Sequence, residues 1–202
     1  MTKTARFVSI LFHPSLILIC VIATLLFIHP YYSTSFLLNQ RLYILASFVL
    51  MLFLVPLASM YIMKNGGIIQ SFELKSREER NFPYLFTTAV IGIIAFQVRH
   101  IFPGLLFKFL AGSAAITLSL YTINHYIKIS AHAAGMAGST SLLLYLLHIE
   151  KNIELWWLIP SIFVITGLVL WARLRLNAHS VKEVYLGLIV GFFIMSVSLM
   201  LL

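Results

Sequence analysis

The feature that most constrains this chain is a series of long apolar segments that follow one another along nearly its whole length. A helix needs roughly 20 apolar residues to cross about 30 Å of hydrocarbon, and in lipid its backbone polar groups must be satisfied internally. The sequence therefore predicts an all-α, polytopic transmembrane helix bundle with six to seven spans, of which the short third is the weakest. The candidate spans are Phe7 to Ile28, Leu42 to Met63, Tyr84 to Val98, Gly104 to Asn124, Ser130 to His148, Leu155 to Ala172 and Val184 to Leu202.

Composition excludes a soluble protein of this size. The chain has 202 residues, of which 61% are hydrophobic and 10% charged, and its mean hydropathy is +0.99. These values are typical of integral membrane proteins. The apolar segments leave no room for a separate soluble domain, so we expect a single integral-membrane domain over residues 1–202. Lys3 and Arg6 precede the first segment as in a signal peptide, but no small-residue cleavage site follows, which predicts an uncleaved first span.

The charges indicate lipid headgroups as partners. The formal net charge is +8, but the Lys and Arg residues lie mainly in short connections between apolar segments, as in loops that face a membrane surface. No nucleic acid is needed to explain them. The 6 acidic residues are all Glu, which excludes Asp-based metal, proton-relay and aspartyl-phosphate chemistry. The single cysteine, Cys20, lies in an apolar segment, so a disulfide within the chain is impossible.

A charged turn between the last two apolar segments is the first candidate site. Ser180 is a good N-cap for the final helix, which would place Glu183 in its first turn, close enough to orient the imidazole of His179. Arg173 lies six residues before that histidine. A cation, an imidazole and a carboxylate at one membrane edge are suited to binding and cleaving a phosphate ester. The alternative is a basic loop that only anchors helix ends at the interface.

Two further polar clusters precede this turn along the chain. In chain order, the connection from Lys64 to Pro83 is the first cluster, the segment around Ser130 and His132 is the second, and the turn from Arg173 to Glu183 is the third. The connection from Lys64 to Pro83 carries mixed charges, which predict either a solvated interfacial helix or a loop whose Lys75 and Arg80 turn inward to hold an anion. The fifth segment opens with Ser130 and His132. A helix N-terminus near Ser130 offers free N–H groups to an anion, and an ionisable group one turn into a membrane helix is a functional candidate.

Span counting places the three clusters together. Two spans separate the first cluster from the second, and two more separate the second from the third, so all three reach the same membrane face. Gly187 and Gly191 lie on the helix face of Glu183 at four-residue spacing, which permits a close approach to a neighbouring helix. The sequence thus predicts a compact bundle with one polar mouth.

The order and spacing of these residues carry a family resemblance. Arg173 is followed after five residues by His179, and His179 after three by Glu183; earlier, Ser130 and His132 flank one alanine. Both patterns resemble the third and second motifs of the type 2 phosphatidic acid phosphatase superfamily. The chain departs from the first motif of the family at its Arg position.

That first motif is Lys, six residues, then Arg-Pro. Lys75 and Pro83 stand at the expected spacing, but Phe82 occupies the Arg position, and Arg80 is the nearest substitute. Glu183 stands where the family has Asp, which lengthens the orienting arm by one methylene. An arginine two residues earlier does not readily replace a bidentate clamp, so a catalytically inactive relative that binds lipid phosphate is an alternative to a divergent enzyme.

The resemblance implies a metal-independent lipid phosphatase of a bacterial inner membrane, with no cofactor. It would cleave a phosphomonoester or pyrophosphate from a lipid of the phosphatidate or polyprenyl type. His179 would be the nucleophile that forms a phosphohistidine, Glu183 its orienting group, and His132 the general acid and base. The residues that would bind the phosphoryl oxygens are Lys75, Arg80, Ser130 and Arg173.

Rival interpretations and the membrane orientation stay open at this level. The 7 histidines invite a metal-transporter hypothesis, but they are scattered and lack accompanying Asp or Cys. His13 and His29 each precede a proline at a predicted helix end, which favours a position at the membrane interface. A structural membrane protein is a further alternative. The positive-inside rule favours a cytoplasmic mouth, because most of the 14 Lys and Arg lie on that face, whereas members of the resembled family often work on the outer face.

Overall fold

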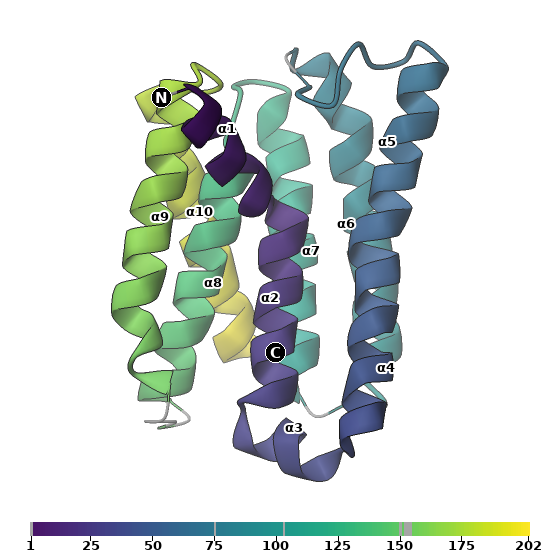
Figure 1. The fold of residues 1–202 in the computed structure, drawn as a ribbon, viewed down its shortest axis with the longest axis vertical. Helices are drawn as coiled ribbons and strands as arrows, with labels where there is room; N and C mark the ends of the chain where they lie inside the picture. Colours follow the sequence, from purple (N-terminus) through teal and green to yellow (C-terminus); the bar gives the residue numbers. More distant parts are fainter. Residues whose placement is uncertain (1, 75, 103, 150, 152–154) are drawn as a thin grey trace.

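The chain forms a bundle of helices that stand roughly side by side (Figure 1). The computed structural model describes residues 2–74, 76–102, 104–149, 151 and 155–202, and none of these lies in a strand. This confirms the predicted all-α membrane bundle. The elements are α1 (Thr2–Leu11), α2 (Pro14–Phe27), α3 (Pro30–Ser35), α4 (Leu38–Val49), the π-helical turn η1 (Leu50–Leu54), α5 (Val55–Asn65), α6 (Glu78–Val98), α7 (Gly104–Asn124), α8 (Ala131–His148), α9 (Leu158–Arg175) and α10 (Val181–Leu201).

Among the described residues, 5 helices are long and apolar enough to cross a membrane, or 6 if α1 and α2 together count as one span. They are the continuous stretch from α4 to α5, then α6, α7, α9 and α10. Helix α8 is more polar, because its first half carries His132 and several Gly and Ser residues. It lies inside the bundle with most of its side chains buried, so neighbouring helices rather than lipid surround its polar groups.

The first predicted span is not one continuous helix. It breaks between Leu11 and Pro14, where α1 and α2 bend by 49°. Pro14 cannot donate a backbone hydrogen bond, and its ring forces the preceding residue out of the helical region. His13 accordingly has extended backbone angles and caps α2 instead, with its Nδ1 accepting a hydrogen bond from the Ser15 N–H at 3.3 Å.

The third span begins earlier than predicted, which corrects the extent of the polar loop before it. We expected a loop up to Pro83, but α6 starts at Glu78. Glu78 and Glu79 occupy its first turn, where carboxylates interact favourably with the positive end of the helix dipole. Arg80 and Pro83 therefore lie on the helix, and the six additional residues give α6 the length of a full span.

Helices α8 and α10 pack backbone against backbone, as the glycine spacing predicts. A Cβ on Gly187 would lie 2.6 Å from the carbonyl oxygen of Ser130, and one on Gly191 would collide with the backbone of Ala134. Only glycine permits this approach. The contact brings the N-termini of α8 and α10 together at the upper edge of Figure 1, where α6 also begins. The prediction that the three polar clusters reach one membrane face is confirmed for their described residues.

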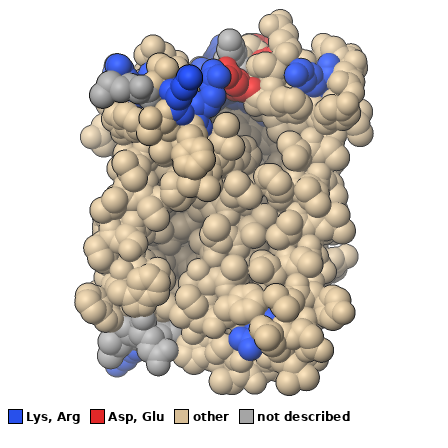
Figure 2. Space-filling view, viewed as in Figure 1, with Lys and Arg blue, Asp and Glu red and all other residues tan. Residues whose placement is uncertain are grey.

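Charged side chains gather at the two ends of the bundle (Figure 2). Figure 2 shows Lys, Arg and Glu along the upper edge of this face, an uncharged middle, and isolated cations at the lower edge. An uncharged middle between two polar edges is the expected surface of a bundle that crosses a bilayer.

Candidate functional site

The site is built around His179, in the turn between α9 and α10. Its Nδ1 lies 2.7 Å from Oε2 of Glu183, one turn into α10. Ser180 caps α10 by accepting a hydrogen bond from the N–H of Glu183 at 3.4 Å. The predicted helix start and the predicted contact between imidazole and carboxylate are therefore both present. The side chain of His179 is buried, so this contact holds its ring in one orientation.

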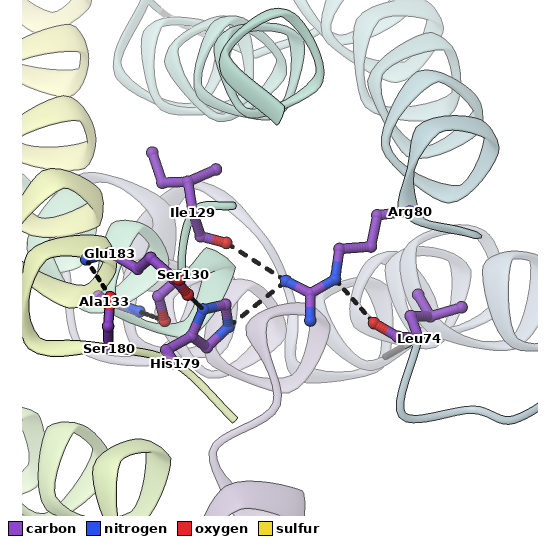
Figure 3. Close-up of polar contacts among 8 residues, drawn as sticks. All are labelled: Leu74, Arg80, Ile129, Ser130, Ala133, His179, Ser180 and Glu183. Carbon is purple, nitrogen blue, oxygen red and sulfur yellow. Dashed lines mark hydrogen bonds and ion pairs between the residues drawn. The ribbon is translucent and has the colours of Figure 1, made fainter. Parts of the chain in front are cut away.

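Arg80 reaches His179 from α6 on the other side of the ring (Figure 3). Its Nε donates to the carbonyl oxygen of Leu74 at 2.8 Å, and its Nη1 lies 3.5 Å from both the carbonyl oxygen of Ile129 and Nε2 of His179. Arg80 is 5% exposed, and within the described part of the chain no carboxylate pairs with it. A buried cation surrounded by neutral acceptors is costly, which makes this a place for an anion.

These two contacts fix the protonation of the imidazole. A guanidinium can only donate, so Nε2 of His179 presents its lone pair to Arg80, and Nδ1 carries the proton that it donates to Glu183. Burial lowers the pKa of His179 to about 2, and the positive charges of Arg80, Arg173 and Lys128 act in the same direction. Although the nearby carboxylate favours the protonated ring, these effects outweigh it, and the ring is neutral at physiological pH.

Ser130 connects the second cluster to the third. It caps α8, with its hydroxyl accepting a hydrogen bond from the N–H of Ala133 at 3.4 Å, and its own N–H donates to the carbonyl oxygen of Glu183 at 3.3 Å. The side chain is fully buried beside His179 in Figure 3. The predicted helix N-terminus at Ser130 is therefore present and is joined directly to the first turn of α10.

His132 and Arg173 meet at a residue that the sequence did not single out. Nε2 of His132 lies 3.0 Å from the carbonyl oxygen of Ser9, and Nη1 of Arg173 donates to the hydroxyl of the same serine at 2.6 Å. The ring of His13 packs edge-on against that of His132, with centroids 5.7 Å apart. His13 therefore adjoins the second cluster.

Cations dominate the electrostatics of the site. Burial lowers the pKa of Lys128, in the connection before α8, and the charges of Arg80 and Arg173 lower it further, whereas Glu183 raises it. Three cations from three parts of the chain thus affect one another around one carboxylate. Such an excess of positive charge attracts anions and would stabilise negative charge that develops during a reaction.

The predicted site residues differ in their placement. Arg80, Ser130, His179 and Glu183 form one connected network, and Arg173 acts on it through its charge. Phe82 is 51% exposed and stacks on Phe86, so it faces away from Arg80 on the helix. Lys75 lies outside the described residues.

Sequence reasoning missed three residues, namely Ser9, His13 and Lys128. Ser9 gave no signal, because a serine in an apolar segment ordinarily bonds to its own helix. His13 did give one, since an ionisable residue before a proline marks a break in a span. Among the described residues, no group of three or more His, Cys, Asp or Glu side chains is arranged to hold a metal ion.

The arrangement could bind a phosphoryl group between the cations of α6 and α9 and present it to the Nε2 lone pair of His179. Comparisons with protein family models, curated proteins and solved structures give no match to this chain. The resemblance to the type 2 phosphatidic acid phosphatases therefore rests on the sequence motifs alone, while the described residues do form a helical bundle with helices apolar enough to cross a membrane.

Proposed function

We propose that this chain is a metal-independent lipid phosphatase that acts through a phosphohistidine intermediate. The observation that carries the proposal is the state of His179: it is neutral, held by Glu183 at Nδ1, and directs its Nε2 lone pair at a buried arginine that pairs with no carboxylate among the described residues. An oriented imidazole beside a site for an anion is the arrangement that nucleophilic attack on phosphorus needs. The site lies at the edge of an apolar bundle, where a lipid headgroup resides, which supports a lipid substrate.

The proposed reaction has two steps. Nε2 of His179 attacks phosphorus, the bond from phosphorus to the lipid oxygen breaks, and the leaving oxygen takes a proton from His132. His132 is neutral in the free protein and takes up this proton when the phosphate anion binds. Water then attacks phosphorus, the neutral His132 accepts a proton from this water, and phosphate leaves as His179 is restored. A positioned acid and base of this kind typically contributes about 10²–10⁴ in rate.

The phosphoryl oxygens would be bound by Arg80, Arg173, Ser130 and Lys75. The 3.5 Å contact between Arg80 and His179 is long for a hydrogen bond, so a phosphate oxygen readily displaces it and takes over the guanidinium. The Nε of Arg173 is buried without a hydrogen-bond partner in the described chain, and it is a further donor for the same group. Lys75 keeps the role that the family resemblance implies.

The test is phosphate release by purified protein in a lipid bilayer mimic with a metal chelator present. The substrate panel contains phosphatidic acid, phosphatidylglycerol phosphate, and polyprenyl phosphate and pyrophosphate. We expect release from at least one lipid and a loss of at least about 10³-fold in His179→Ala, because the variant lacks the nucleophile. Radiolabelled phosphate should remain on the wild-type protein after a rapid alkaline quench and be missing from the variant.

The matched control is His125→Ala. His125 is an exposed histidine at the same membrane edge, just after α7, and its Nδ1 and ring contact the carbonyl oxygen and the ring of Tyr121. This variant should release phosphate at the wild-type rate. Equal release by His179→Ala and wild type would exclude His179 as the nucleophile.

A second candidate function is binding of lipid phosphate without turnover. The exposed position of Phe82 favours it, because the family's arginine would stand there and the chain offers one guanidinium fewer. This candidate predicts that phosphatidic acid raises the melting temperature of the wild type but not of Arg80→Ala, while no lipid in the panel releases phosphate.

A further inference from the structure

We propose that Ser9 is a positioning residue of this site, which holds His132 through its main-chain carbonyl and Arg173 through its hydroxyl. The inference rests on the proposed function. It extends the site to α1, a helix at the opposite end of the chain from the motif that contains Arg173.

Two hydrogen bonds carry the proposal. His132 Nε2 lies 3.0 Å from the Ser9 carbonyl oxygen, and Arg173 Nη1 lies 2.6 Å from the Ser9 hydroxyl. Ser9 is 7% exposed, so water does not compete freely for either bond. One residue of α1 thereby sets the positions of groups on α8 and α9. Hydrogen bonds from charged donors are about twice as strong as neutral ones, so the contact with Arg173 is the stronger of the two.

The structure of α1 explains how Ser9 reaches the site. The break before Pro14 turns α1 away from the axis of α2 and lays it against α9. Ala5 and Ser9, one helical turn apart, are buried on the inner face, while Phe7 and Ile10 are 65% and 63% exposed. Small residues at four-residue spacing allow a close helix contact. A straight first span would carry Ser9 away from α9.

The carbonyl of Ser9 determines which nitrogen of His132 can exchange a proton. A carbonyl only accepts, so Nε2 of His132 carries a hydrogen and Nδ1 is the nitrogen that gains and loses the catalytic proton. The ring of His13 packs edge-on against the same ring. His132 and His179 are thus held with opposite nitrogens available, Nδ1 in the first and Nε2 in the second.

The hydroxyl of Ser9 determines how Arg173 can meet a phosphate. It engages Nη1, while Nε has no hydrogen-bond partner in the described chain. The guanidinium is therefore anchored by one nitrogen and keeps others for an anion. Anchoring lowers the entropy that is lost when the arginine binds a phosphate, so removal of the hydroxyl should weaken phosphate binding.

The experiment compares Ser9→Ala and Ser9→Thr with the control Thr4→Ala, which removes an exposed hydroxyl from the same helix. Two quantities are measured in purified, bilayer-reconstituted protein: the dissociation constant for inorganic phosphate, from its effect on the melting temperature, and KM and kcat for the best lipid substrate of the wild type. We expect Ser9→Ala to weaken phosphate binding and raise KM about tenfold, Ser9→Thr to restore both to within about threefold, and Thr4→Ala to match the wild type.

The outcomes separate this inference from the proposed function. If Ser9→Ala binds inorganic phosphate as tightly as the wild type, the positioning role is overturned even when the variant melts at a lower temperature. If the wild type binds phosphate and Ser9→Ala binds it about tenfold less tightly, the role of Ser9 is supported. Absence of phosphate release from every lipid by the wild type counts against the proposed reaction alone.

The carbonyl contact has its own test. Nitrogen NMR of the ring of His132 in the phosphate-free protein at neutral pH should give the pattern of the neutral form with hydrogen on Nε2. The pattern of the form with hydrogen on Nδ1 would overturn the contact with Ser9, because a carbonyl cannot donate to a bare Nε2.

Discussion

The two membrane edges of the bundle use cations differently. At the lower edge, Arg99 donates to its neighbour His100 at 2.8 Å and lies over Phe96, and Lys108 donates to the carbonyl of Leu199 at 3.1 Å. Arg99 and Lys108 thus each have a hydrogen-bond acceptor, and Arg41 lies over the ring of Phe27 although its Nε is buried without a hydrogen-bond partner in the described chain. These are contacts expected of side chains that anchor helix ends. The upper edge instead gathers cations from α6, α9 and the connection before α8 around one imidazole.

This difference separates anchoring from binding. Anchoring places single charges where water and headgroups can solvate them, and it costs little. Gathering Arg80, Arg173 and Lys128 in a partly buried space raises their mutual repulsion, which the described carboxylate of Glu183 only partly offsets. A bundle that needed only anchors would not require such a cluster. This contrast supports the proposed phosphate site at the upper edge.

The difference between the two edges is tested most directly by removing one arginine from each edge. Arg80→Ala should lower kcat/KM for the lipid phosphate by about 10²–10³-fold, because the guanidinium that faces the reacting nitrogen is lost. Arg99→Ala should change it less than twofold. Steady-state phosphate release by both variants checks this. Comparable losses in the two variants would mean that the edges do not differ in function.

A second prediction concerns the helix contact that assembles the upper edge. Gly191→Ala should destabilise the protein by about 3 kcal/mol, because the new Cβ collides with the backbone of Ala134 and must separate α8 from α10. Phosphate release should fall as well, since the bond between Ser130 and Glu183 depends on the same contact. The control is Gly167→Ala on α9, where no atom lies within 4 Å of the new Cβ. Unfolding in mixed micelles measures the stability of the two variants. Equal stabilities would refute close packing of α8 and α10.

The smallest effect is a pH dependence of stability. The pKa of His179 is about 2 in the folded protein, and that of an unfolded histidine is about 6.5. Below pH 6.5 the unfolded state binds a proton that the folded state does not, so stability falls as the pH falls. Between pH 7 and pH 5 the wild type should lose about 2 kcal/mol more than His179→Gln. His100→Gln, at an exposed lower-edge position, should follow the wild type; a His179→Gln variant that does so too would contradict a buried, neutral ring.

Much of the fold followed from local patterns. The apolar segments predicted the helices, Ser130 and Ser180 predicted helix N-termini, and Gly187 and Gly191 predicted a close helix contact. The errors arose where a proline or a charge made the pattern ambiguous. The sequence predicts one continuous span across the break before Pro14, and it predicts a loop for the charged residues before Pro83, which instead start α6.

The sequence by itself determined the membrane class, the starts of α8 and α10 and the contact between His179 and Glu183, because each depends on composition or on interactions within about one helical turn. Only the tertiary structure decided that Arg80 rather than its neighbour Phe82 faces this histidine, since a helix directs adjacent side chains in different directions and packing selects the inner face. It also decided that Ser9 joins His132 to Arg173. Such a contact joins residues more than a hundred positions apart, and no spacing along the chain encodes it.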